Sequence, residues 1–439
     1  MKPPRISVIL LILITLLVTG CTSSDSFTTP TVNFTLTLTH TPKPILTATS
    51  TPTSTVTSTI TPTPKPITWR ITLGNFLGMG LDLITEDWII ITGPFLSPRE
   101  AAQNLLFMVD QNGNVIWEKG IESERDLVVM SIQQTMDDGF IVVGLIQGET
   151  DENICLIKFD QSGNKIWESC FGETIIAPEI GLGSLPVSVQ QTQDGGFIIV
   201  GKIYPANTKY PNVLLVKTDS SGNVEWENSF GESNIHNSAS KVLQTSDGEF
   251  IFAGQTWPMN FSSFKAWIIK TDSEGNTIWE KTFGESGHNT GVNSIQQTDD
   301  GGFIFTGSMY PNGANYADVW LVKLDKEGHI EWQQSYGGER NDSGTGVYQI
   351  SDGGYILLGN TYSFGAGDSD IWLIRTDENG NLVWDKTFGD DLFNESIAFQ
   401  QSSDGGFVLL GFSIDISTEQ GWSELIKTDM DGNIQSDDY

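Results

Sequence analysis

Residues 193–201 read QDGGFIIVG, and near-copies of this stretch recur along the chain. The copies are DWIIITG ending at Gly93, DDGFIVVG at Gly144, DGEFIFAG at Gly254, DGGFIFTG at Gly307, DGGYILLG at Gly359 and DGGFVLLG at Gly411. Successive terminal glycines lie 51, 57, 53, 53, 52 and 52 residues apart. This period predicts seven copies of one structural unit instead of two or three unrelated domains.

Each unit contains four short segments that read as strands. Good examples are NSIQQT (293–298), GFIFTG (302–307), VWLVKLD (319–325) and NTIWEKTF (276–283). They are rich in β-branched and aromatic residues and are bounded by turn signals. Asp-Gly-Gly after the first segment and Asp-x-x-Gly-Asn after the third supply glycines that adopt positive φ without steric cost. The unit is therefore predicted to be a four-stranded antiparallel meander.

The second segment is apolar at consecutive positions, as in Phe-Ile-Ile-Val at 197–200. A strand of this kind is covered on both faces, which radially packed propeller blades provide. Seven third strands are followed by only six tryptophan-bearing fourth strands, and TWRITLG at 68–74 matches the missing one. We therefore predict an all-β, seven-bladed β-propeller of four-stranded antiparallel blades over 68–439. The N-terminal strand 68–74 completes the last blade and closes the ring.

The N-terminal region has the features of a secretory signal. Lys2 and Arg5 precede an apolar run at 6–17 that is short for a membrane span, and small residues lead to Cys21. Val-Thr-Gly-Cys at 18–21 resembles the lipobox of bacterial lipoproteins. That resemblance implies a signal peptide at 1–20, lipidation of Cys21, and a cell-membrane lipid anchor facing the cell surface or periplasm. The alternative is an ordinary cleaved signal that leaves a free cysteine.

A low-complexity segment separates the lipidation site from the repeats. Residues 22–67 hold 17 threonines and 7 prolines with three charged residues. Such a composition favours extended, disordered chain, so 21–67 is predicted to be a lipidated cysteine plus a tether. The whole chain carries 55 acidic against 23 basic residues, a net charge of −32. This charge repels nucleic acid, which we exclude as a partner.

The repeat also resembles a known family. Its pattern, TxDGGFIxxG followed by DxWLIKTDxxGNxxWxKTFG, is similar to the propeller repeat of about 50 residues in bacterial and archaeal surface lipoproteins. The Asp-x-x-Gly-Asn-x-x-Trp part is distantly similar to the docking turn of quinoprotein-type propellers. Their Thr-Gly pair, eighth blade and adjacent cysteine pair are absent from this sequence, and we expect no cofactor.

Recurring polar and aromatic residues are expected to be structural. The fourth-strand tryptophans are interpreted as inter-blade packing, and the glutamines before the first turn as hydrogen-bond links between neighbouring strands. The former are Trp117, Trp167, Trp226, Trp279, Trp332 and Trp384, and the latter Gln134, Gln191, Gln244, Gln297, Gln349 and Gln401. Cys155 and Cys170 fall on two arms of one hairpin, but the expected register does not place them directly opposite, so a disulfide stays open.

The variable connections on one face of the ring are the expected functional surface, because function on a rigid scaffold concentrates in its loops. The candidate ligand-binding residues there are Tyr204, Tyr210, Trp257, Phe261, Tyr310, Tyr316 and Tyr362. His236 and His288, at similar places in adjacent units, are weak metal candidates, since no third ligand has readable spacing.

No catalytic motif is readable, and catalysis stays uncertain, with a non-enzyme favoured. The first expectation is a lipid-anchored extracytoplasmic module that binds a glycan or protein through the variable face. The alternatives are a polysaccharide-acting hydrolase or lyase, and a membrane-associated assembly scaffold. Fold alone does not choose among them.

Overall fold

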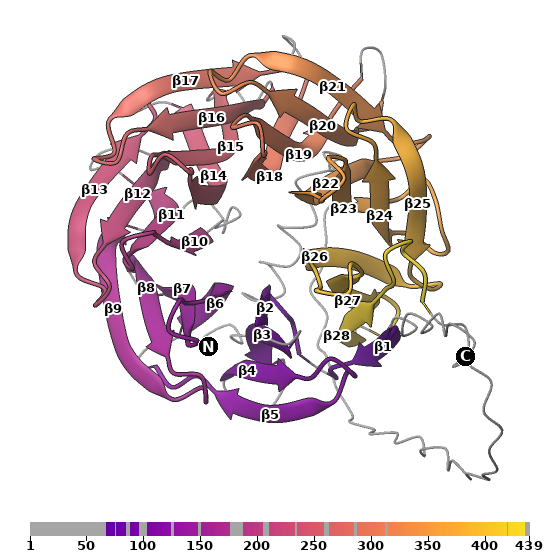
Figure 1. Cartoon of the computed structure of the whole chain (residues 1–439), viewed down its shortest axis with the longest axis horizontal. Helices are drawn as coiled ribbons and strands as arrows, with labels where there is room; N and C mark the ends of the chain where they lie inside the picture. Colours follow the sequence, from indigo (N-terminus) through magenta and orange to yellow (C-terminus); the bar gives the residue numbers. More distant parts are fainter. Residues whose placement is uncertain are drawn as a thin grey trace, which may run out of the picture.

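The computed structural model describes residues 67–434 apart from 75, 85–87, 96–102, 124–126, 148–150, 176–187, 205–209, 233–234, 259–262, 285–287, 312–314 and 419. The predicted signal, Cys21 and the tether lie outside these residues. The described strands form seven four-stranded antiparallel sheets around a central axis (Figure 1). The chain is therefore a seven-bladed β-propeller, as predicted. None of the described segments is a helix with the length and hydrophobicity of a membrane span.

The first three blades follow one another along the chain. Blade 1 contains β2 (Gly80–Ile84), β3 (Trp88–Phe95), β4 (Gln103–Val109) and β5 (Val115–Gly120). Blade 2 contains β6 (Leu127–Gln134), β7 (Phe140–Gln147), β8 (Asp151–Phe159) and β9 (Lys165–Ile175). Blade 3 contains β10 (Ser188–Gln191), β11 (Phe197–Ile203), β12 (Asn212–Thr218) and β13 (Val224–Phe230).

The next three blades repeat this order from the axis outward. Blade 4 contains β14 (Ile235–Gln244), β15 (Phe250–Pro258), β16 (Lys265–Thr271) and β17 (Thr277–Phe283). Blade 5 contains β18 (Thr290–Gln297), β19 (Phe303–Met309), β20 (Asp318–Leu324) and β21 (Ile330–Tyr336). Blade 6 contains β22 (Asp342–Gln349), β23 (Tyr355–Thr361), β24 (Asp370–Thr376) and β25 (Leu382–Phe388).

Blade 7 joins the two ends of the ring. It contains β26 (Phe393–Gln401), β27 (Phe407–Asp415), β28 (Gln420–Lys427) and, as its outer strand, β1 (Trp69–Thr72). β1 pairs antiparallel with β28 from Trp69↔Lys427 to Thr72↔Glu424, and the Arg70 guanidinium contacts the Glu424 carboxylate at 2.5 Å. The predicted closure by the N-terminal strand is confirmed.

Tryptophans of the outer strands dock each blade on the next one. Trp167 of β9 lies over Gly222 in the turn of blade 3, where φ is +80° and an added Cβ would sit 2.7 Å from the indole. The same docking occurs at Trp69–Gly113, Trp117–Gly163, Trp226–Gly275, Trp279–Gly328, Trp332–Gly380 and Trp384–Gly432. All seven interfaces thus use one contact, and the interpretation of these tryptophans as inter-blade packing is confirmed.

Glutamines link the inner strands around the ring. The Gln191, Gln244, Gln297 and Gln349 Oε1 atoms accept backbone N–H groups from the preceding blade's first turn, at 2.7–2.8 Å. Their neighbours Gln133, Gln190 and Gln296 accept the backbone N–H of the following blade's inner strand, at 2.5–2.7 Å. Hydrogen bonding between neighbouring strands is therefore confirmed for these glutamines.

A buried cation on the third strand pairs with the aspartate of the first hairpin turn in most blades. The Lys323 ammonium of β20, only 5% exposed, contacts Asp300 in the first turn at 2.8 Å and Glu331 at 3.0 Å. Equivalent pairs are Lys158–Asp137, Lys217–Asp194, Lys270–Asp247, Arg375–Asp352 and Lys427–Asp404. The repeated Asp of DGG and Lys of KTD are explained by this clamp.

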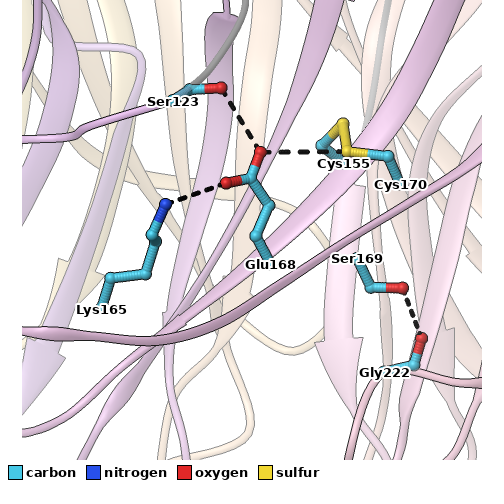
Figure 2. The surroundings of a disulfide bond; sticks show 7 residues. All are labelled: Ser123, Cys155, Lys165, Glu168, Ser169, Cys170 and Gly222. Carbon is cyan, nitrogen blue, oxygen red and sulfur yellow. Dashed lines mark hydrogen bonds and ion pairs between the residues drawn. A yellow bond between two sulfur atoms is a disulfide. The ribbon is translucent and has the colours of Figure 1, made fainter.

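Cys155 and Cys170 form a disulfide between β8 and β9 (Figure 2). The expected register is wrong: the two residues are direct cross-strand partners, with Cα atoms 4.1 Å apart. A bulge between Lys158 and Phe159 inserts one residue into β9 and shifts the pairing by one position. If residues are paired by counting outward from the turn without this bulge, Cys170 is assigned to the residue next to Cys155 instead of to Cys155 itself.

Candidate functional site

Four of the predicted ligand-binding aromatics occupy one equivalent position. Tyr204, Trp257, Tyr310 and Tyr362 each stand three residues after the repeated glycine of the second strand, in blades 3, 4, 5 and 6. All four side chains are half-buried; Trp257 lies near the end of β15, and the other three lie at the start of the second-to-third connection. Since the blades are consecutive, these rings form an arc on the variable face of the propeller. We refer to these four residues as the aromatic arc.

Trp257 is held by stacking. The centroids of the His236 imidazole of β14 and the Trp257 ring lie 3.7 Å apart at an interplanar angle of 17°, and Phe264 contacts Trp257 edge-on with the ring centroids 6.3 Å apart. Burial and then the nearby positive charge of Lys202 lower the pKa of His236 to about 3, so the imidazole is neutral at physiological pH. The Lys202 ammonium also lies 5.4 Å from the Tyr204 ring, which links the first two members of the arc.

Tyr362 is fixed by a buried acid. Its hydroxyl donates to the Glu395 Oε1 atom at 3.3 Å, and the Glu395 carboxyl is also hydrogen-bonded by Ser369 and Asn360. Burial raises the pKa of Glu395 to about 8 despite these hydrogen bonds, so the group is protonated at pH 7. The Arg340 guanidinium lies 5.9 Å from the Tyr362 ring.

The remaining predicted aromatics lie outside the arc. Tyr316 is 46% exposed in the connection before β20, and Tyr210 is half-buried just before β12. Phe261 lies outside the described residues. The sequence places all seven aromatics in the variable connections. Their position relative to the repeated glycine separates the four residues of the aromatic arc from these three.

The histidine candidates do not assemble a metal site within the described part of the chain. Among those residues, one group of three Cys, His, Asp or Glu side chains is close enough to share an ion: Cys155, Glu168 and Cys170. Its two sulfurs are joined in the disulfide, and Glu168 pairs with Lys165 at 3.0 Å (Figure 2). His236 is instead engaged with Trp257.

A channel along the propeller axis is a second candidate site. It encloses about 380 Å³ and is lined by all seven inner strands. This volume is within the range of roughly 300–1,000 Å³ found for small-molecule sites. The lining combines hydroxyl and amide groups with apolar side chains such as Met79, Ile397 and Phe399.

One ring of equivalent positions in the channel has a single outlier. In each blade, the residue that pairs with the position just before the repeated glycine lies on the inner strand that lines the channel. Six of the seven are small: Gly80, Ser131, Ser188, Ser294, Gly346 and Ala398. The seventh is Lys241 of β14, which pairs with Ala253. Lys241 is absent from the sequence-based candidates, although aligning the inner strands of the repeats identifies it.

Asp82 introduces a carboxylate at one end of the channel. It stands where other blades have the linking glutamine, and its oxygens accept the N–H of Gln134 at 2.6 Å and of Leu83 at 3.0 Å, and the amide of Gln400. Burial raises the pKa of Asp82, against these hydrogen bonds and the charge of Lys241. Asp82 thus performs the glutamine's structural role.

Comparison with known proteins is informative about the fold alone. No protein-family model matches the chain, and no curated protein matches it. Similar solved structures include YCF48 bound to D1 peptide, with 12% identity, TM-score 0.46, and coverage of 85% of this chain and 98% of that one. An α-L-arabinanase from Penicillium chrysogenum complexed with arabinobiose has 10% identity, TM-score 0.47, and coverage of 83% and 99%. The β-propeller domain of the Trilobed protease from Pyrococcus furiosus has 12% identity, TM-score 0.44, and coverage of 80% and 94%.

Proposed function

We propose that this chain is a lipid-anchored, extracytoplasmic and non-catalytic module that binds a glycan through the aromatic arc. The observation that carries the proposal is the placement of Tyr204, Trp257, Tyr310 and Tyr362 at one equivalent position of four adjacent blades. Regularly spaced rings suit a ligand that itself repeats, because each sugar unit presents an apolar face of the same kind. The connections around the arc supply the polar groups that fix orientation.

Preorganisation of the arc supports a binding role. Trp257 stacks on His236 and contacts Phe264 edge-on, and Tyr362 is hydrogen-bonded to Glu395 with the Arg340 guanidinium 5.9 Å from its ring. Side chains already fixed in one orientation lose little conformational entropy when a ligand binds. The arc therefore offers affinity without remodelling of the propeller.

The enzymatic alternative, a polysaccharide hydrolase or lyase, calls for carboxyl groups that flank the substrate. Glu395 is an acid that is protonated at neutral pH, but its oxygens are engaged by Ser369, Asn360 and Tyr362. We assign it to positioning Tyr362. An assembly scaffold at the membrane is the other alternative, and it predicts a protein partner in place of a glycan.

Binding is tested by titrating the purified protein with soluble glycan fragments and following the melting temperature. Trp257→Ala and Tyr362→Ala are expected to weaken binding by about tenfold each, as for truncation of a central aromatic contact. Tyr316→Ala, on the same face but outside the arc, is the matched control. Release of new reducing ends from a bound glycan would refute the non-catalytic assignment, and absence of any glycan response would favour a protein partner.

The lipid anchor has a separate test. The anchor predicts that the mature protein partitions into detergent, because an acyl chain adds membrane affinity for each buried methylene. Cys21→Ser should move the protein to the aqueous phase and remove the corresponding mass. An unchanged partition in this variant would contradict the anchor and leave the glycan proposal intact.

A further inference from the structure

We propose that the axial channel binds a small organic monocarboxylate, held by the Lys241 ammonium. This site is independent of the aromatic arc. The lysine is the departure from a ring that is otherwise Gly, Ser or Ala. The Lys241 side chain is exposed in the channel, and the other six blades pack without a long side chain at this position.

The Lys241 ammonium has no fixed partner. Within the described residues, no hydrogen bond or ion pair holds it, and Asp82 influences it only through longer-range charge. Desolvation by the surrounding blades lowers the pKa of Lys241, against the charge of Asp82. The side chain nevertheless keeps solvent-accessible surface, so an anion in the channel can reach the ammonium group.

A hydroxyl on the neighbouring blade is also unpartnered. The Ser188 Oγ atom is buried, with 4% of the residue exposed, and finds no hydrogen-bond partner among the described residues. Ser188 and Lys241 stand at equivalent positions of adjacent inner strands that line the channel. Ser131 and Ser294 hold the same position in blades 2 and 5 and are half-buried. The hydroxyl groups of the half-buried serines therefore make the lining on this side of the channel polar.

The opposite side of the channel has a mixed lining. Blades 1, 6 and 7 contribute the small residues Gly80, Gly346 and Ala398 and the apolar Met79 and Ile397, beside the polar side chains of Thr345 and Gln400. A small carboxylate whose body makes apolar contacts fits beside these residues. One cation in a chain of net charge −32 favours a monoanion over a phosphate dianion, which would meet more repulsion and too few donors.

The test uses benzoate, its neutral isostere benzamide, hexanoate and inorganic phosphate, titrated into the purified protein at constant ionic strength and followed by ligand-observed NMR. Benzoate or hexanoate is expected to bind, with benzamide and phosphate at least about tenfold weaker. Lys241→Ser, which restores the residue of blades 2, 3 and 5, should weaken carboxylate binding at least about tenfold and keep the fold. Lys281→Ser, on the outer strand β17, is the control.

Three results with the organic ligands would overturn the proposal. These are equal binding of benzoate to the wild type and Lys241→Ser, equal binding of benzamide and benzoate, and no response to either carboxylate. Tighter binding of phosphate would assign the channel to inorganic anions and also refute it. The melting temperature of unliganded Lys241→Ser separates loss of binding from loss of fold.

Discussion

The clamp between Lys323 and Asp300 makes a quantitative prediction about acid stability. Partial burial alone would raise the pKa of Asp300, but hydrogen bonds from Lys323, Thr298 and Gly302 outweigh it and lower the pKa from 3.8 to about 2. The full shift corresponds to about 2.5 kcal/mol. Because the Asp300 side chain is 58% exposed, solvent screening reduces this to about 1 kcal/mol.

The direction follows from the two pKa values. A carboxyl group whose pKa is depressed in the folded state stabilises the fold above the unfolded-state value, near 4, and loses this contribution as the pH falls through about 2. Asp300→Asn is therefore expected to lower the free energy of unfolding by about 1 kcal/mol at pH 7 and by almost nothing at pH 2.

Urea unfolding followed by tryptophan fluorescence measures this difference, since every blade has a docked tryptophan. Asp299→Asn, a neighbouring charge removal in the same turn, controls for net charge. A destabilisation by Asp300→Asn that is equal at pH 7 and pH 2 would refute the clamp as its cause, and would point to altered turn geometry instead.

Three further outcomes are expected. Gly307→Ala should lower the melting temperature strongly and destabilise the fold by about 3 kcal/mol, because the added Cβ would lie 1.9 Å from the Gly291 carbonyl oxygen of β18. A melting temperature of the variant within a degree of wild type would contradict this close approach. Cys155→Ser should cost about 3 kcal/mol, as expected for a loop spanning 15 residues, and alkylation of both cysteines without reductant would show that the bond is absent. Glu395→Gln should leave the stability of the fold near pH 5 little changed and make the variant more stable than wild type at pH 8. The reason is that a carboxyl group with a raised pKa destabilises the fold as the pH rises from its unfolded-state pKa to its folded-state pKa. Urea midpoints at both pH values measure this difference, and a variant that is less stable than wild type at pH 8 would refute a neutral Glu395.

The fold was predictable because every blade meets the next through the same contact. Trp167 on Gly222 and the amide of Gln191 on the preceding turn recur around the ring, so the residues that build the interface recur in the sequence. The closing strand was predictable for the same reason, since Trp69 carries the docking residue of the missing copy.

The candidate sites were less predictable because they depend on strand pairing that the residue pattern does not show. A bulge lies between Ala239 and Lys241 and interrupts the alternation of β14, so simple periodicity does not place Lys241 in the lining of the channel. The bulge at Lys158 misplaced Cys170 in the same way. Strand pairing brings His236 to Trp257, and blade packing brings Glu395 to Tyr362. No local pattern in the sequence encodes either contact.

The closure of blade 7 also decides how the molecule responds to force. Tension applied through the chain that precedes residue 67 reaches the ring first at β1, whose four register pairs with β28 carry the load together. The Arg70–Glu424 contact and the bond from the Trp69 indole to the Gln111 carbonyl oxygen at 2.9 Å reinforce that strand from both sides. The strand that closes the ring is therefore the element that tension detaches first. Once β1 is pulled away, blade 7 loses its outer strand and blade 1 loses its docked tryptophan.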